Sequence, residues 1–146
     1  MASVSTYLIF PGNTEEAFNF YKTVFQSEFV GEIMRVGGAP PNPGAPPLSE
    51  ADQNLVMHVM LPILGGVHHL MGTDAVESMG FNVVFGNNNY ICLSPDTKLE
   101  TKRLFDELSA DGKVEMELQD MFWGAYYGSC TDKFGVQWMF NCDEKA

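Results

Sequence analysis

The sequence is poor in basic residues, cysteine and histidine. Its 146 residues include two arginines, six lysines, three cysteines and three histidines against 19 acidic residues, so the formal net charge is −11 at neutral pH. A surface that binds duplex nucleic acid needs clustered lysine and arginine to displace counterions. A strongly negative protein is also repelled by anionic lipid headgroups. We therefore expect neither nucleic acid nor a membrane as a partner.

Long apolar runs and targeting signals are also missing. No segment reaches the roughly 18 apolar residues of a membrane span, and residues 1–6 have neither the basic nor the apolar region of a signal peptide. The three cysteines, Cys92, Cys130 and Cys142, lack C-x-x-C spacing and lie in apolar segments. These features predict buried free thiols in a reducing cytoplasm.

Signatures of several enzyme classes are absent as well. The chain has no G-x-S-x-G nucleophile elbow, no G-x-x-x-x-G-K-[ST] phosphate-binding loop and no G-x-G-x-x-G dinucleotide motif. What the chain does have is material for a core, because 45% of its residues are hydrophobic and 12% are aromatic. That content excludes intrinsic disorder. At this length we expect a single domain, residues 1–146.

In the first half, the apolar pattern predicts a strand, a helix and three further strands. Residues 7–10 form a short apolar run, and Asn13 opens a capping signal before a helical apolar face. Further strands are predicted at 28–36, 55–61 and 67–71, with a turn at Gly65-Gly66 before the last. Between Gly37 and Pro47, eight of eleven residues are glycine or proline. This segment is predicted to be a loop, either a surface excursion or a lid.

The second half repeats this order. A strand is predicted at 89–94, a helix start at Asp96-Thr97 with Glu100, a helix end at Gly112, and strands at 113–118, 125–131 and 136–142. An offset of 83 residues maps the segment 7–10 onto 90–93 and Asn13-Thr14 onto Asp96-Thr97. The pattern indicates an ancient duplication, with a first module at 1–74, a connection at 75–88 and a second module at 89–142.

Several segments carry a resemblance to a known family. They are Tyr7–Asn13, Val56-Met57-His58, Leu70–Asp74, Arg103–Asp106, Gly112-Lys113-Val114, Phe122-Trp123-Gly124 and Thr131–Met139. With them, the chain resembles the vicinal oxygen chelate superfamily of glyoxalase I, bleomycin-resistance proteins and extradiol dioxygenases. Within it, the chain is similar to the PhnB-like branch, which is named 3-demethylubiquinone-9 3-methyltransferase-like. A methyltransferase would need a glycine-rich nucleotide-binding turn, and the sequence has none.

The resemblance implies an α+β fold of two tandem βαβββ modules, with a cleft between curved mixed sheets, assembled as a homodimer. Superfamily enzymes hold a divalent metal in that cleft through histidine, glutamine or glutamate. Counted from the family motifs, the four ligand positions fall at Thr6, at Leu70 or Met71, at Asn89 or Tyr90, and at Met139. These side chains do not suit a hard divalent cation. We therefore expect no metal and no cofactor.

The three histidines do not supply a replacement metal site. His68 and His69 are adjacent in a predicted strand, so their side chains point to opposite faces, and His58 is separated from His68 by roughly 16 Å along the hairpin. His58 itself lies in an apolar strand. It is either a hydrogen-bonded core residue or a group that orients a ligand or transfers a proton.

An aromatic cluster is the other candidate feature. Seven aromatic residues lie between Phe122 and Phe140, and they either pack the core and a dimer interface or line a ligand cleft. In the family register, Trp138 and Phe140 face the helices. The predicted ligand-binding residues are Thr6, His58, Tyr90, Trp123, Tyr127 and Met139.

Together these observations predict a cytoplasmic homodimer that binds an unidentified small molecule without the superfamily metal. Two alternatives stay open. The protein is instead a lyase-like or dioxygenase-like enzyme of the superfamily with metal-independent or unusual chemistry, or it has a structural or partner-binding role.

Overall fold

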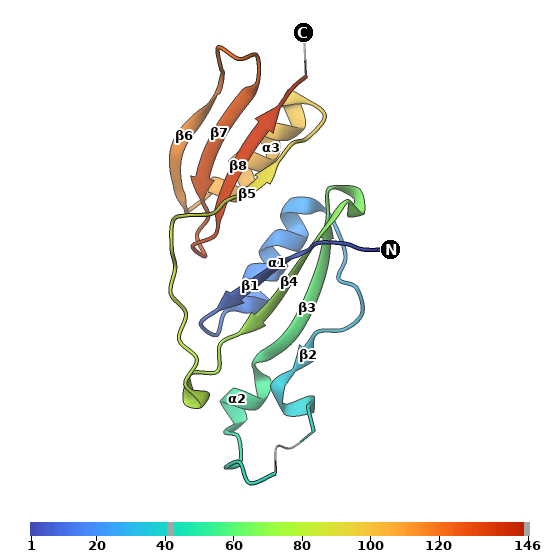
Figure 1. Ribbon diagram of the computed structural model, residues 1–146, viewed down its shortest axis with the longest axis vertical. Helices are drawn as coiled ribbons and strands as arrows, with labels where there is room; N and C mark the ends of the chain where they lie inside the picture. The colour runs from blue at the N-terminus through green and yellow to red at the C-terminus, as the bar shows by residue number, and fades with distance from the viewer. Residues whose placement is uncertain (41–42, 145–146) are drawn as a thin grey trace. The chain divides into compact units, whose positions relative to one another are not determined.

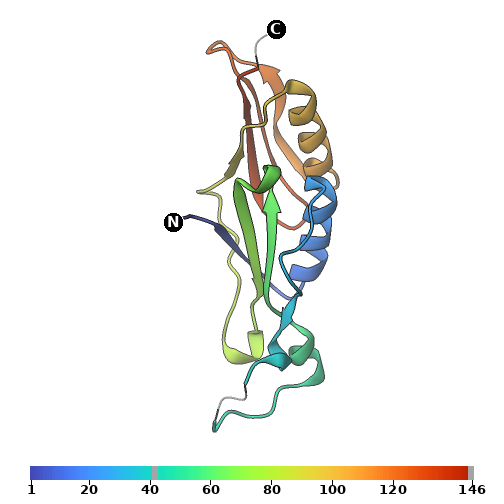
Figure 2. The same ribbon diagram turned by 90° about the vertical axis from the view of Figure 1, so that its right-hand side faces the viewer.

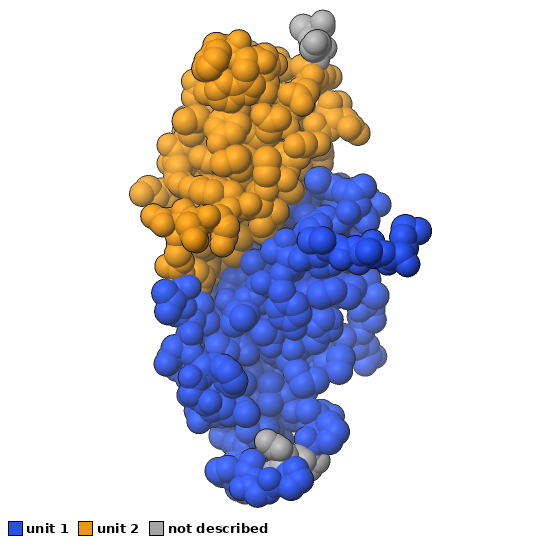
Figure 3. Space-filling model, in the orientation of Figure 1, with its two compact units in different colours: residues 1–84 blue, residues 85–146 orange. Residues whose placement is uncertain are grey.

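The computed structural model describes residues 1–40 and 43–144 and divides into two compact units, Met1–Val84 and Phe85–Ala146 (Figure 1, Figure 3). Each unit contains one four-stranded sheet in which the first strand of the unit runs parallel to the last. Both sheets have the order first, fourth, third, second. This is the predicted α+β fold of two βαβββ modules, and neither sheet closes into a barrel. Among the described residues, every helix is too short or too polar to cross a bilayer.

Unit 1 is built on a single sheet with one long helix. Its elements are β1 (Thr6–Phe10), α1 (Thr14–Phe25), β2 (Met34–Arg35), α2 (Glu50–Asn54), β3 (Val56–Ile63) and β4 (His68–Asp74), with 3-10 turns at Val36–Gly38, Leu64–Gly66 and Glu77–Met79. Helix α1 packs on one face of the sheet (Figure 2). There Phe18 meets Phe10 edge-on, with 6.4 Å between ring centroids. We call the face away from α1 the open face of this sheet.

Unit 2 repeats the arrangement. It contains β5 (Ile91–Leu93), α3 (Lys98–Ser109), β6 (Lys113–Asp120), β7 (Tyr126–Thr131) and β8 (Gln137–Cys142). Trp138 and Phe140 are fully buried, and the ring of Phe140 lies 5.3 Å from that of Phe105 on α3. The predicted orientation of these two side chains toward the helix is confirmed. The opposite side is the open face of the second sheet.

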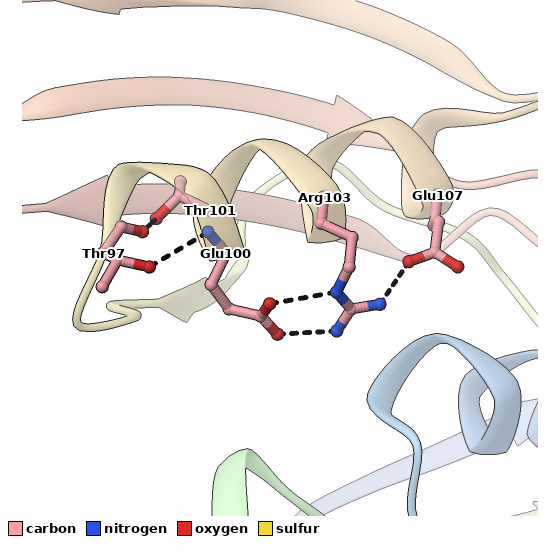
Figure 4. A network of polar contacts seen from close by, with 5 residues as sticks. All are labelled: Thr97, Glu100, Thr101, Arg103 and Glu107. Carbon is pink, nitrogen blue, oxygen red and sulfur yellow. Dashed lines mark hydrogen bonds and ion pairs between the residues drawn. The ribbon is translucent and has the colours of Figure 1, made fainter.

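The two long helices start in different ways. For α3 the predicted cap is confirmed, because the hydroxyl of Thr97 accepts a hydrogen bond from the N–H of Glu100 at 3.1 Å (Figure 4). For α1 the predicted cap is wrong, since the Asn13 side chain makes no capping bond. Instead, Oδ1 of Asp74 accepts from the N–H of Thr14 at 2.9 Å. A carboxylate from the end of β4 thus satisfies a helix amide that a local cap would otherwise serve.

Two predicted boundaries are wrong for local reasons. The strand predicted at 28–36 is reduced to Met34–Arg35, and Gly31 interrupts the preceding segment with a φ of +72°. The predicted helix end at Gly112 is also wrong, because Asp111, and not the glycine, takes the left-handed conformation. Gly112 serves a close approach instead, since a Cβ there would lie 2.3 Å from the carbonyl oxygen of Thr131.

Strand β3 continues past its predicted end and includes Pro62. Strand β2 pairs only with the start of β3, at Val56 and His58. The other edge of β3 pairs with β4 as far as Ile63. Proline therefore sits where one side of the strand has no neighbouring strand and its missing N–H costs no ladder bond.

Candidate functional site

The open face of the first sheet ends in a cavity of about 940 Å³. Its floor is formed by Ile9 of β1, Met57 of β3 and Thr73 of β4. The Pro/Gly-rich segment contributes a roof that includes Ala39 and Leu48, and the connection after β4 contributes a side wall. This volume is within the range of sites that bind small organic molecules.

Strand alternation directs two of the floor residues onto the open face. Ile9 and Thr73 are direct neighbours in the parallel pair of β1 and β4. Along their strands they alternate with Phe10 and Asp74, which are buried. Because successive side chains of a strand point to opposite faces, Phe10 faces α1, and Ile9 and Thr73 face the cavity. Asp74 borders the cavity at the end of β4.

The third floor residue is presented by a β-bulge. Met34 pairs with His58 whereas Arg35 pairs with Val56, so Met57 is an extra residue on β3. A bulge redirects the side chains around it, and bulges are frequent beside functional sites. The flexible thioether of Met57 supplies an adaptable apolar surface at this point.

Hydrogen bonds hold together the two ends of the connection between β2 and β3, which contains the Pro/Gly-rich segment. The guanidinium of Arg35 donates to both carboxylate oxygens of Glu15 on α1, each at 3.0 Å, and to the carbonyl oxygen of Asn54 at 3.0 Å. The N–H of Val36 donates to the carbonyl oxygen of Leu55 at 2.9 Å. The hydrogen bonds from Arg35 lower the pKa of the Glu15 carboxyl, so the pair stays ionised at neutral pH.

Among the described lining residues, Asp74 carries the only charge. Its side chain is almost fully buried, and its two oxygens accept from the backbone N–H groups of Thr14 and Val56 at 2.9 and 2.8 Å. A carboxylate used in this way joins α1, β3 and β4 and has little capacity left for a ligand. The described walls of the cavity are otherwise neutral and mainly apolar.

Two of the predicted site residues belong to unit 1 and lie on opposite faces of its sheet. Thr6 shares its side of β1 with Phe10, and its hydroxyl is 2.8 Å from Nε2 of His68. His58 lies on the open face, where its Nδ1 is 3.2 Å from the hydroxyl oxygen of Tyr7. The structure therefore does not bring Thr6 and His58 together, and it shows Tyr7 as a partner that sequence reasoning missed.

Tyr90 in unit 2 takes part in a polar chain on the second sheet. Its hydroxyl donates to Oε2 of Glu115 at 2.5 Å, and the hydroxyl of Thr131 donates to Oε1 of the same carboxylate at 2.9 Å. The bond to Glu115 raises the pKa of Tyr90, so the phenol stays protonated at neutral pH. Next to Tyr90 in sequence, the carbonyl oxygen of Asn89 accepts a hydrogen bond from the side-chain amide of Gln137 at 2.6 Å.

The other predicted residues of unit 2 lie elsewhere on that sheet. Trp123 and Tyr127 contact each other edge-on, with 5.9 Å between ring centroids, and Trp123 is half exposed. Met139 is the register neighbour of Cys92 and Ser129, on the side opposite the buried Trp138. The structure thus brings Trp123 and Tyr127 together, whereas Met139 is a register neighbour of residues on β5 and β7.

The residues at the expected metal positions do not fit a hard divalent cation. The Thr6 hydroxyl is bonded to His68, Leu70 is fully buried, the Tyr90 hydroxyl is bonded to Glu115, and Met139 offers a soft thioether. Within residues 1–40 and 43–144, no group of three or more His, Cys, Asp or Glu side chains is arranged to hold a metal ion.

The cysteines differ from one another in exposure. The prediction of three buried thiols is wrong for Cys92, which is exposed, whereas Cys130 and Cys142 are buried. Cys92 alternates with the buried Leu93 on the short strand β5, so its side chain points to the open face. Burial raises the pKa of Cys130 to about 12, and Cys92 also has a raised pKa, mainly through desolvation. Neither thiol is activated as a nucleophile.

The cavity is a feature that sequence reasoning did not locate. The sequence contained an indication of it, because one connection is much longer in the first module than in the second. Residues 36–55 separate β2 from β3, whereas only residues 121–125 separate β6 from β7. The long connection is the part of module 1 that has no counterpart in module 2. Residues 41–42 of the predicted loop lie outside the described residues.

Comparisons with known proteins give a consistent family. A family model described as the Glyoxalase/Bleomycin resistance protein/Dioxygenase superfamily matches residues 3–140. Protein YjdN of Escherichia coli (strain K12) is 32% identical, with 94% of this chain and 93% of that protein aligned. The crystal structure of protein PA1353 from Pseudomonas aeruginosa is 31% identical, covers 99% of this chain and 100% of its own, and has a TM-score of 0.82.

A PhnB protein from Bacillus cereus is a further structural relative. It is 27% identical, covers 97% of this chain and 99% of its own, and has a TM-score of 0.73. It carries a provisional name as a 3-demethylubiquinone-9 3-methyltransferase.

Proposed function

Because the chain belongs to the Glyoxalase/Bleomycin resistance protein/Dioxygenase superfamily, we propose that it is a small-molecule-binding protein that works without the superfamily metal. The carrying observation is the cavity of unit 1, with its apolar floor and its roof of proline and glycine residues. Binding proteins of this kind sequester a ligand, as bleomycin-resistance proteins do.

The electrostatics of the cavity support binding rather than metal-assisted catalysis. Its single described charge, Asp74, is occupied by two backbone amides. An enolate or an activated oxygen species needs a nearby positive charge for stabilisation. The described lining residues include no lysine, arginine or histidine.

The proposal extends to assembly and location. We expect a homodimer, because large apolar side chains on both sheets, such as Met34 and Met116, are exposed in the single chain. We place the protein in the cytoplasm, since all three cysteines are free thiols.

The binding proposal predicts that filling the cavity abolishes ligand uptake. Ala39 lines the roof in an extended backbone conformation, with φ −77° and ψ 153°, that any residue adopts. In Ala39→Trp, the indole occupies space that a ligand would use. We expect the fluorescence-detected affinity for the neutral probe N-phenyl-1-naphthylamine to fall about tenfold or more. Treatment of the wild type with EDTA should leave the affinity unchanged.

A matched variant tests whether the effect belongs to the cavity. Ala51 on α2 is exposed and is not among the lining residues, so Ala51→Trp should bind the probe as the wild type does. Equal affinities for the wild type and Ala39→Trp would contradict the assignment of the site. Loss of binding on EDTA treatment would contradict the metal-free mechanism.

A further inference from the structure

We infer that the cavity of unit 1 selects a ligand with an apolar body and one neutral hydrogen-bonding head group, and that Tyr7 and His58 bind this head group. The inference rests on the proposed function and adds the chemical class of the ligand. It depends on the position of the pair, on its hydrogen-bonding capacity and on the distribution of charge in unit 1.

The Tyr7–His58 pair forms a bridge across the open face. Strands β1 and β3 lie on either side of β4 in the sheet. The bond from the Tyr7 hydroxyl to Nδ1 of His58, with 5.9 Å between ring centroids, therefore passes over β4. Ile9 follows Tyr7 on the same face by two residues, roughly 7 Å along the strand. Since Ile9 and Met57 line the cavity, the bridge stands at its border.

The pair retains hydrogen-bonding capacity for a ligand in either tautomer of His58. If Tyr7 donates to Nδ1, Nε2–H remains a donor and the phenol oxygen remains an acceptor. If Nδ1–H donates to Tyr7, the phenol O–H remains a donor and Nε2 an acceptor. Within the described residues, no further hydrogen bond uses these atoms, and Tyr7 is 49% exposed. The bridge thus offers one donor and one acceptor beside an apolar floor.

The charge distribution favours a neutral head group over an anionic one. Residues 1–84 contain eight acidic and only two basic side chains. Lys22 is paired with Glu28 at 3.1 Å, and Arg35 is paired with Glu15 at 3.0 Å. Neither basic residue lines the cavity. An anionic ligand would therefore lose its hydration without gaining a cationic partner.

A tyrosine of unit 2 supplies the control for loss of a phenol hydroxyl. Tyr126 on β7 has its ring centroid 5.5 Å from Nζ of Lys98, and it is not among the residues that line the cavity. It is also not one of the predicted ligand-binding residues. Removing its hydroxyl therefore changes a tyrosine without touching the cavity of unit 1.

The test compares three probes of similar size by equilibrium dialysis: 2-naphthol, 2-methylnaphthalene and 2-naphthoate. The measured quantity is the ratio of the 2-naphthol affinity to the 2-methylnaphthalene affinity. We expect Tyr7→Phe and His58→Gln to lower this ratio about 5–10-fold, as loss of one hydrogen bond to the head group would. Tyr126→Phe should leave the ratio unchanged. 2-Naphthoate should bind more weakly than either of the other two probes to every variant.

The outcomes separate this inference from the proposed function. If the ratio is unchanged in both Tyr7→Phe and His58→Gln, the head-group assignment is overturned. If Ala39→Trp still weakens the binding of both probes, the cavity remains the binding site. An equal fall of the ratio in Tyr126→Phe also overturns the assignment. If none of the probes binds the wild type, the proposed function and the inference both fail.

Discussion

At the scale of single residues, Asp74 joins three elements of unit 1 through its side chain. It ends β4, accepts from the first amide of α1 at Thr14, and accepts from the first amide of β3 at Val56. Asn13, in the position of a local cap, leaves its side-chain oxygen buried and without a partner among the described residues. The start of α1 is therefore fixed by a residue 60 positions away.

This difference predicts opposite outcomes for two alanine variants. Asp74→Ala should lower the free energy of unfolding by about 2–4 kcal/mol, because it leaves two buried N–H groups without an acceptor. Asn13→Ala should change it by less than about 0.5 kcal/mol, because no capping bond is lost. Urea denaturation followed by circular dichroism measures both. A larger loss in Asn13→Ala than in Asp74→Ala would contradict the assignment of the cap.

At the scale of elements, close packing of α1 on its sheet depends on a glycine. A Cβ at Gly72 of β4 would lie 2.4 Å from Cε1 of Phe18 and 3.0 Å from Cγ2 of Thr14. Phe18 is fully buried between Phe10 and Tyr21. The ring has no free space to move into, so the helix can approach this strand only where the side chain is absent.

We therefore expect Gly72→Ala to destabilise the protein by about 1–3 kcal/mol through overpacking. Gly38→Ala is the matched control, because a Cβ there meets nothing within 4 Å and the residue does not adopt a positive φ. Combining Gly72→Ala with Phe18→Leu should recover part of the loss by removing the ring atoms that clash. Thermal unfolding of the wild type, the three single variants Gly72→Ala, Gly38→Ala and Phe18→Leu, and the double variant measures the effects. Additive losses in the double variant would rule out the proposed contact.

The element scale also shows what sequence patterns could reveal. Local sequence patterns predicted the order of elements in the two modules and the Thr97 cap, and the family register predicted the inward direction of Trp138. Features set by distant residues were not predicted. The cap of α1 depends on Asp74, and the role of Gly112 depends on the carbonyl of Thr131.

The cavity belongs to the second group of features. It forms because hydrogen bonds from Arg35 and Val36 to Asn54 and Leu55 hold the two ends of the connection between β2 and β3 together. This connection has no regular apolar periodicity, and it covers the end of the sheet. The ligand-binding roles predicted for Thr6, Tyr90, Trp123, Tyr127 and Met139 stay predictions. His58 now has a defined polar neighbour in Tyr7.

At the scale of the whole molecule, acidic charge and exposed apolar surface act in opposite directions. Within the described part of the chain, ion pairs to acidic groups are formed by Lys22, Arg35, Lys98, Lys102 and Arg103. Because 19 acidic side chains outnumber eight basic ones, the net charge is −11. Meanwhile Met34 on one sheet and Met116 on the other are 50% and 38% exposed. Two copies that cover such surfaces gain apolar burial while their charges repel.

The proposed homodimer should consequently become tighter as salt is added. The Debye length falls from about 30 Å at 0.01 M salt to about 10 Å at 0.1 M, which screens the repulsion and leaves apolar burial unaffected. We expect analytical ultracentrifugation to give a mass of twice 16.2 kDa, with a dimer dissociation constant that falls several-fold over this range. A monomer at all concentrations would refute the dimer. A dimer that weakens with salt would instead indicate an interface held by complementary charges, because screening reduces attraction and repulsion alike.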